Sequence, residues 1–137
     1  MPSRRRWLLL EATVDLLAAR LLLKFVPFRR LTWLFERRVN RPELPNPARD
    51  ELKREVRWAI VTAARRAPEQ VVCFPRAMAA QAMLRRRGVS TTLYYGASRR
   101  PELGLIAHVW LQDGDEGVLG SRAARGHVVL ARYPDPS

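Results

Sequence analysis

Apolar side chains recur every three or four residues through the first two thirds of the chain, which is the spacing of one face of an α-helix. The spacing predicts four helices, over residues 7–25, 28–39, 46–66 and 74–87. Pro27 is expected to end the first helix, Asn46 to cap the third with Pro47 at its first position, and Gly88 to follow the fourth. The first helix has apolar residues on more than one flank, so we expect it to pack between partners.

Beyond Gly88 the pattern changes to an alternation of apolar and polar residues, which is typical of half-buried strands. It predicts four strands, over residues 91–95, 105–112, 117–119 and 127–133. Helices followed by antiparallel strands predict an α+β fold, with N-terminal helices followed by a small antiparallel sheet. A proline-rich connector between Pro42 and Pro47 divides the chain into a helical segment, residues 1–45, and a second unit, residues 46–137.

The composition bears on compartment and cofactors. The single cysteine permits no internal disulfide, which fits a reducing compartment, and we expect the protein to be cytoplasmic. Charged residues interrupt the N-terminal apolar run, so a signal peptide, a membrane-spanning helix and membrane contact are not expected. The cysteine and the two histidines lack the spacing of metal ligands, so the sequence predicts no metal site.

The net charge of +12 indicates an acidic partner, which could be nucleic acid, an anionic membrane surface, or an acidic peptide or protein. A basic, solvated face without a partner is the alternative. The arginine clusters are not interleaved with aromatic residues, as they would be in a platform that stacks single-stranded bases. Nucleic acid is therefore not expected as the partner.

Cys73 and His108 are the residues whose setting suggests chemistry. Pro75 fits the first position of the fourth helix, which predicts Cys73 at the helix N-terminus, where free N–H groups and the helix dipole favour a thiolate. His108 lies on the strand predicted over residues 105–112, on the face opposite Val109. If the Val109 face packs on the core, His108 points toward the opposite layer, where the Cys73 helix could lie.

A thiol at a helix start and a histidine on a strand are the two parts of a cysteine nucleophile and its base. The structural alternatives are a small buried hydrophobic residue for Cys73 and a hydrogen-bonded strand residue for His108. His127 is the only rival base, and we interpret it as a surface histidine at the start of the last strand. Gln70 could donate to an oxyanion beside the Cys73 N–H, although a plain polar loop residue is the alternative.

Four segments resemble the lasso peptide maturation protease, the transglutaminase-like leader peptidase of lasso peptide clusters. They are Cys73-Phe-Pro-Arg-Ala, the helix end Leu84-Arg-Arg-Arg-Gly88-Val89, Leu93-Tyr-Tyr-Gly96 and Ala107-His108-Val-Trp110. The resemblance implies a papain/transglutaminase-like cysteine protease core in residues 46–137. Residues 1–45 are expected to dock a partner, because their helices have apolar flanks left over from the core. The resemblance also implies an endopeptidase that removes the leader from a ribosomally made precursor peptide and needs no cofactor. A small leader-recognition protein would deliver the precursor, and a separate lasso cyclase would receive the core peptide.

The chain departs from the family at the residue that orients the histidine, which is acidic in the family pattern. Antiparallel pairing about a turn at Gly114-Asp115 places Gly120 and Ser121 opposite His108, and neither is acidic. Asp113 lies about 16 Å along the strand. The orienting group is left open between Ser121, a backbone carbonyl and Asp113. Two other functions stay open: a non-catalytic scaffold in the maturation complex, suggested by the missing acid, and a basic nucleic-acid-binding protein, suggested by the charge.

Overall fold

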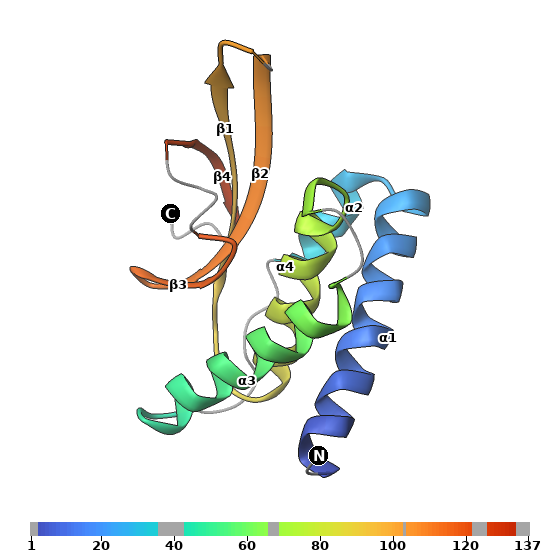
Figure 1. Ribbon diagram of the computed structural model, residues 1–137, viewed down its shortest axis with the longest axis vertical. Helices are drawn as coiled ribbons and strands as arrows, with labels where there is room; N and C mark the ends of the chain where they lie inside the picture. Colours follow the sequence, from blue (N-terminus) through green and yellow to red (C-terminus); the bar gives the residue numbers. More distant parts are fainter. Residues whose placement is uncertain (1–2, 36–42, 66–68, 103, 122–125, 134–137) are drawn as a thin grey trace.

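The computed structural model describes residues 3–35, 43–65, 69–102, 104–121 and 126–133. Within these ranges the helices are α1 (Ser3–Phe25), α2 (Phe28–Phe35), α3 (Ala48–Ala63) and α4 (Glu69–Arg86), and the strands are β1 (Thr92–Arg100), β2 (Gly104–Asp113), β3 (Glu116–Leu119) and β4 (Val128–Tyr133). The helices gather on one side of the sheet, and α3 and α4 lie between α1 and the strands (Figure 1). The predicted α+β fold is confirmed.

The sheet is antiparallel, with the strand order β3-β2-β1-β4. β1 and β2 form a long hairpin that pairs Thr92 with Gln112 at one end and Arg100 with Gly104 at the other. β1 therefore extends five residues beyond the predicted strand, because backbone pairing with β2 continues through Ser98 and Arg99 without needing apolar side chains. The predicted turn after β2 is confirmed, with Asp113 paired to Glu116.

One apolar core joins the helices to the inner face of the sheet, which we define as the face that carries Leu93, Val109 and Leu111. These side chains belong to the same buried cluster as Met83 and Leu84 of α4. The buried stripe of α1 belongs to it too, and consists of Leu8, Ala12, Leu16 and Ala19. The core thus includes residues on both sides of the predicted boundary at residue 45, and the division into two segments stays a prediction.

Two clusters of ion pairs hold the layers together. Arg86 and Arg87 at the end of α4 bind Glu11 of α1, and Arg86 also binds Asp15. The hydrogen bond from Arg87 lowers the pKa of Glu11, although burial acts in the opposite direction. The second cluster connects α3 to the turn after β2, where Arg49 and Lys53 bind Asp113.

The helix boundaries differ from the predicted ones at two places. α3 begins at Ala48 with Pro47 in the capping position and no side-chain capping bond, so the prediction of Asn46 as the cap is wrong. The backbone carbonyls of Pro45 and Pro47 accept the N–H groups of Arg49 and Glu51 instead. Residues 36–39 and 66, at the ends of two predicted helices, lie outside the described residues.

α4 begins at Glu69, five residues before the predicted start, and Pro75 lies inside it. At this place a proline loses the hydrogen bond to the residue four before it and its ring crowds that carbonyl, which disfavours the extra turn without excluding it. The other end follows the prediction. Gly88 has φ +84°, and the N–H of Val89 donates to the carbonyl of Leu84 at 2.9 Å, which is the bonding of a glycine-terminated helix.

Candidate functional site

Cys73 is the fifth residue of α4, in its second turn, and its side chain is half-buried. The prediction that it lies at the head of the helix is wrong, because the four free N–H groups of an α-helix belong to its first turn, which here begins at Glu69. Within the part of the chain that the structure describes, no residue forms a hydrogen bond with its Sγ atom. Gln70 is the second residue of α4, and its side chain lies outside the described atoms.

His108 is held in the sheet with 7% of its surface exposed. Its Nε2 atom lies 2.9 Å from the carbonyl oxygen of Gly120, at the end of β3. Since a carbonyl only accepts, Nε2 carries the hydrogen and Nδ1 is the basic nitrogen of the neutral ring. Its ring also stacks on Trp110, with centroids 5.9 Å apart. Of the orienting groups that the sequence left open, the backbone carbonyl is therefore the one in contact with His108.

Asp113 and Ser121 make other contacts. Asp113 accepts hydrogen bonds from Arg49 Nε at 2.6 Å and from Lys53 Nζ at 2.9 Å, both on α3. The Arg49 hydrogen bond lowers the pKa of Asp113, while desolvation acts in the opposite direction. Ser121 Oγ is buried without a hydrogen-bond partner among the described residues, and it occupies the space where a Cβ on Gly117 would lie. Asp113 is thus engaged with α3, and Ser121 Oγ forms no hydrogen bond with His108 among the described residues.

Cys73 and His108 belong to different sides of the sheet. The inner face of β2 carries Val109 and Leu111, as expected, but α4 packs on this same face. His108 alternates with Val109 and projects from the opposite face, which we call the outer face. No hydrogen bond joins Cys73 to His108 among the described residues, so the dyad stays a prediction that needs a functional test.

His127 lies beside His108, although the sequence analysis interpreted it as a surface residue. It is half-buried, its ring centroid is 5.7 Å from that of His108, and its Nε2 atom is 3.4 Å from Ser98 Oγ. This interpretation was wrong because β4 pairs with β1, aligning Ala97 with Val128 and bringing the preceding histidine onto the outer face. A neighbour across two strands leaves no spacing pattern in the sequence.

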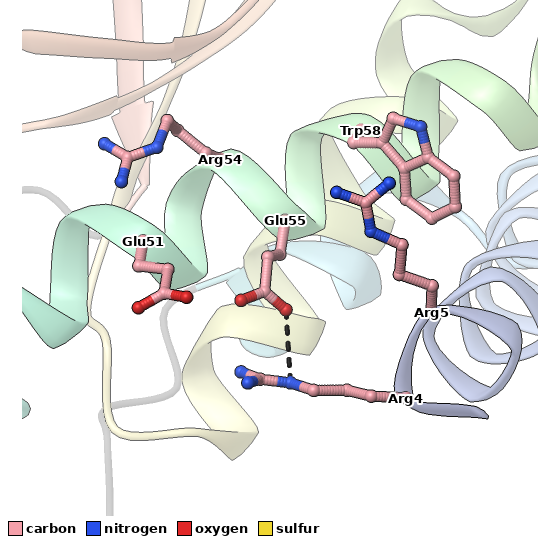
Figure 2. A pocket seen from close by; sticks show the side chains of 6 residues that line it. All are labelled: Arg4, Arg5, Glu51, Arg54, Glu55 and Trp58. Atoms are coloured by element: carbon pink, nitrogen blue, oxygen red, sulfur yellow. Dashed lines mark ion pairs between the residues drawn. The ribbon is translucent and has the colours of Figure 1, made fainter. Parts of the chain in front are cut away.

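A pocket of about 520 Å³ lies at the N-terminal end of α1, away from the residues predicted for the site. Figure 2 shows its six lining residues, which are Arg4, Arg5, Glu51, Arg54, Glu55 and Trp58. Arg4 pairs with Glu55 at 3.1 Å, and the Arg5 guanidinium lies 5.0 Å from the centre of the Trp58 ring. Arg5 and Trp58 belong to different helices, so no spacing pattern in the sequence places the ring beside the guanidinium.

No cluster of three or more histidine, cysteine or acidic side chains that could hold a metal ion occurs within the described ranges. None of the helices in those ranges is both long enough and apolar enough to cross a membrane.

Comparison with known proteins identifies a family but no individual relative. A family model described as the transglutaminase-like superfamily matches residues 16–131, a range that includes both Cys73 and His108. No curated protein and no solved structure shows a significant match. Because the match covers most of the chain, the protein belongs to the transglutaminase-like superfamily, which typically includes cysteine proteases and transglutaminases.

Proposed function

We propose that the protein is a cysteine endopeptidase that removes the leader from a ribosomally made lasso precursor peptide, with Cys73 as nucleophile and His108 as base. The observation that carries the proposal is the hydrogen bond between His108 Nε2 and Gly120, inside a family match that spans both residues. It fixes the tautomer in which Nδ1 can accept the proton of a thiol. A Gly120 carbonyl then takes the orienting role that an acidic residue has in related triads.

Cys73 and His108 lie on different sides of the sheet in this structure, so the proposed chemistry requires a rearrangement that brings Sγ to Nδ1. His108 Nδ1 takes the Cys73 proton as Sγ attacks the carbonyl carbon of the scissile peptide bond. The imidazolium returns that proton to the leaving amine, and the acyl group stays on sulfur as a thioester. Water, deprotonated by His108, then adds to the thioester, and the thiolate leaves with the proton. The core peptide departs in the first step with a free N-terminus, the group that a cyclase needs.

Delivery of the substrate is part of the proposal. The partners are the leader region of the precursor, a small leader-recognition protein and a lasso cyclase, and the reaction takes place in the cytoplasm. Holding the precursor through a third protein raises its effective concentration at the nucleophile without new contacts there. We therefore expect slow cleavage of free precursor and faster cleavage with the partner.

The test is cleavage of precursor in the presence of the leader-recognition protein, measured by mass spectrometry. Cys73→Ala should abolish product, and His108→Ala should lower the rate about 10²–10⁴-fold, as expected for loss of a general base. His127→Ala is the matched control, because it removes the neighbouring imidazole from the same face. Cleavage retained by Cys73→Ala, or a loss in His127→Ala that equals the loss in His108→Ala, would contradict the assignment.

A non-catalytic scaffold is the second candidate, favoured by the placement of α4 on the inner face and of His108 on the outer face. A scaffold should bind the precursor and its partner equally well with Cys73→Ala, and the unmodified protein should release no core peptide. Thiol alkylation separates the candidates independently. A nucleophilic Cys73 should react with iodoacetamide at pH 6–7, below the ordinary thiol pKa of about 8.5, whereas a structural, half-buried thiol should react only as the pH approaches that value.

A further inference from the structure

α1 carries large apolar side chains on the side that faces away from the core. Six of them are between 53% and 71% exposed, and they are Trp7, Leu10, Val14, Leu17, Leu21 and Phe25. We call this set the α1 stripe. The buried positions of the same helix, such as Ala12 and Leu16, lie on the opposite side of the helical wheel. Single exposed apolar residues are ordinary, but a contiguous row of this size marks an interaction surface.

The spacing of the α1 stripe indicates what covers it. Its residues follow one another at intervals of three, four, three, four and four, so from Trp7 to Leu21 they repeat as the a and d positions of two heptads. At 100° per residue they cover an arc of about 80°, the narrow seam with which one helix packs along another. Spacing of three and four occurs on any amphipathic helix, but a stripe this narrow favours a partner helix, because a strict a and d stripe is narrower than an ordinary amphipathic face.

The charges beside the α1 stripe that lack an ion-pair partner among the described residues have one sign. Arg6, Arg20 and Lys24 line one flank, are exposed, and form no ion pair with a described acidic residue. The acidic residues of the other flank, Glu11 and Asp15, are bound to arginines at the end of α4. The unneutralised charge along the seam is therefore positive, which calls for carboxylates on the partner.

A second copy of this chain fits the seam poorly. In an antiparallel pairing centred on Val14, Arg6 of one copy lies beside Arg20 of the other, so like charges meet. In a parallel pairing the basic flank meets the flank of Glu11, whose carboxylate already binds Arg86 and Arg87. Neither arrangement supplies free carboxylates to the three cations.

We propose that the α1 stripe is the docking site for an amphipathic helix of a partner protein, which lays an apolar seam along Trp7 to Leu21 and directs flanking carboxylates at Arg6, Arg20 and Lys24. The chemistry of this contact is independent of the protease proposal. Only the identity of the partner as the deliverer of the precursor rests on that proposed function.

The test uses the full chain and two designed helical peptides, each with leucine at the a and d positions and either glutamate or lysine at the flanking positions. Fluorescence anisotropy should show binding of the glutamate peptide, weaker binding of the lysine peptide, and loss of affinity as salt rises. Leu17→Ser should lower affinity about tenfold or more, as at the centre of an interface. Leu105→Ser is the matched control, since that leucine is exposed and belongs to β2, a strand that α4 separates from α1 (Figure 1).

Arg20→Glu should invert the preference, so that the glutamate peptide binds more weakly and the lysine peptide more tightly. Cys73→Ala should bind both peptides as the unmodified chain does. The latter result keeps this test separate from the test of proteolysis. Equal binding of the two peptides, equal loss in Leu17→Ser and Leu105→Ser, or no binding would overturn the proposal. So would a dimer in sedimentation that Leu17→Ser abolishes, or binding to phosphatidylglycerol vesicles that exceeds binding to the peptide.

Discussion

The inner and outer faces of the sheet are made by the same strands but are covered in different ways. On the inner face, Leu93, Val109 and Leu111 pack against helices that come from distant parts of the sequence. On the outer face the cover is local: Tyr94 stacks on Trp110 with centroids 5.6 Å apart, and Trp110 stacks on His108. Trp110 is buried although it lies outside the apolar cluster that includes the helices.

Burial of a strand residue therefore has different consequences on the two faces of the sheet. Inner residues contribute the free energy of apolar burial, which scales with the area removed from water. Outer residues form a stack of rings that includes the His108 imidazole, which forms a hydrogen bond with the carbonyl of Gly120. Each face can be disturbed separately, because successive residues of β2 belong to opposite faces.

The largest effect is expected on the inner face. Leu111 is fully buried, so Leu111→Ala should lower the free energy of unfolding by about 2–5 kcal/mol through lost burial and a residual cavity. Leu105→Ala, on the same face of the same strand but 72% exposed, should change it by less than about 0.5 kcal/mol. Urea unfolding followed by circular dichroism measures both. Similar losses in the two variants would mean that the helices do not cover the inner face as described.

On the outer face, Gly96→Ala should be the most damaging small change. A Cβ on residue 96 would lie 2.7 Å from Cη2 of Trp110 and 2.8 Å from the Val128 carbonyl oxygen, both closer than real contacts allow. We expect a loss of about 1–3 kcal/mol in the free energy of unfolding, the usual cost of overpacking.

Replacing the indole provides the control for this variant. In a Trp110→Leu background the added methyl group should cost less, because one of the two close contacts is removed while that to Val128 remains. The four free energies come from the same urea titrations. An equal cost of Gly96→Ala in both backgrounds would show that Trp110 does not stack over residue 96.

The elements of this fold were predictable because each is encoded by a local period. Apolar residues spaced by three and four predicted α1. The alternation of apolar and polar residues after Gly88 predicted β2, with Val109 and Leu111 correctly placed on the inner face. The turn at Gly114 followed from local chemistry as well, since that residue has φ +60°, which glycine adopts without strain. The start of α4 was missed, because Pro75 marks a helix start only statistically.

The site was less predictable, because it depends on which layer lies on which face. Alternation assigned His108 to the face opposite Val109, but no pattern in one strand says that α4 packs on the Val109 side. The same limit applies to His127, whose proximity to His108 depends on the strand order β2-β1-β4. The contact of Gly120 with His108 was foreseeable, since it follows from the short turn between β2 and β3.

At the end of β2 the inner face becomes polar, and Asp113→Asn tests the ion pairs there. Loss of the carboxylate that binds Arg49 and Lys53 should lower the free energy of unfolding by about 1–2 kcal/mol at pH 7, because the site is only partly exposed. The pKa of Asp113 is lowered from 3.8 in the folded state. The contribution of the Asp113 carboxylate to the free energy of unfolding is therefore complete above pH 3.8. It disappears as the pH falls through the lower pKa of the folded state.

The measurement is urea unfolding of the unmodified protein and of Asp113→Asn between pH 7 and pH 2. The difference between their free energies of unfolding should narrow below pH 3.8. Asp115→Asn changes the same charge in the same turn at an exposed position and should have little effect at any pH. A difference between the unmodified protein and Asp113→Asn that stays constant down to pH 2 would be incompatible with a carboxylate stabilised by Arg49.

The smallest effect is expected at the matching end of the outer face, where Gln112 holds the Trp110 indole. Its Oε1 atom accepts the Trp110 N–H at 2.7 Å, and its side-chain amide donates to the Gly114 carbonyl at 3.1 Å. Gln112→Met keeps the length of the side chain and removes both bonds, so the free energy of unfolding should fall by about 0.5–1.5 kcal/mol. Gln112→Glu retains an acceptor for the indole and should lose less, as measured by urea unfolding. If the methionine variant were as stable as the unmodified protein, the outer ring stack would depend on ring packing alone, and its polar contacts would contribute nothing to holding Trp110 beside His108.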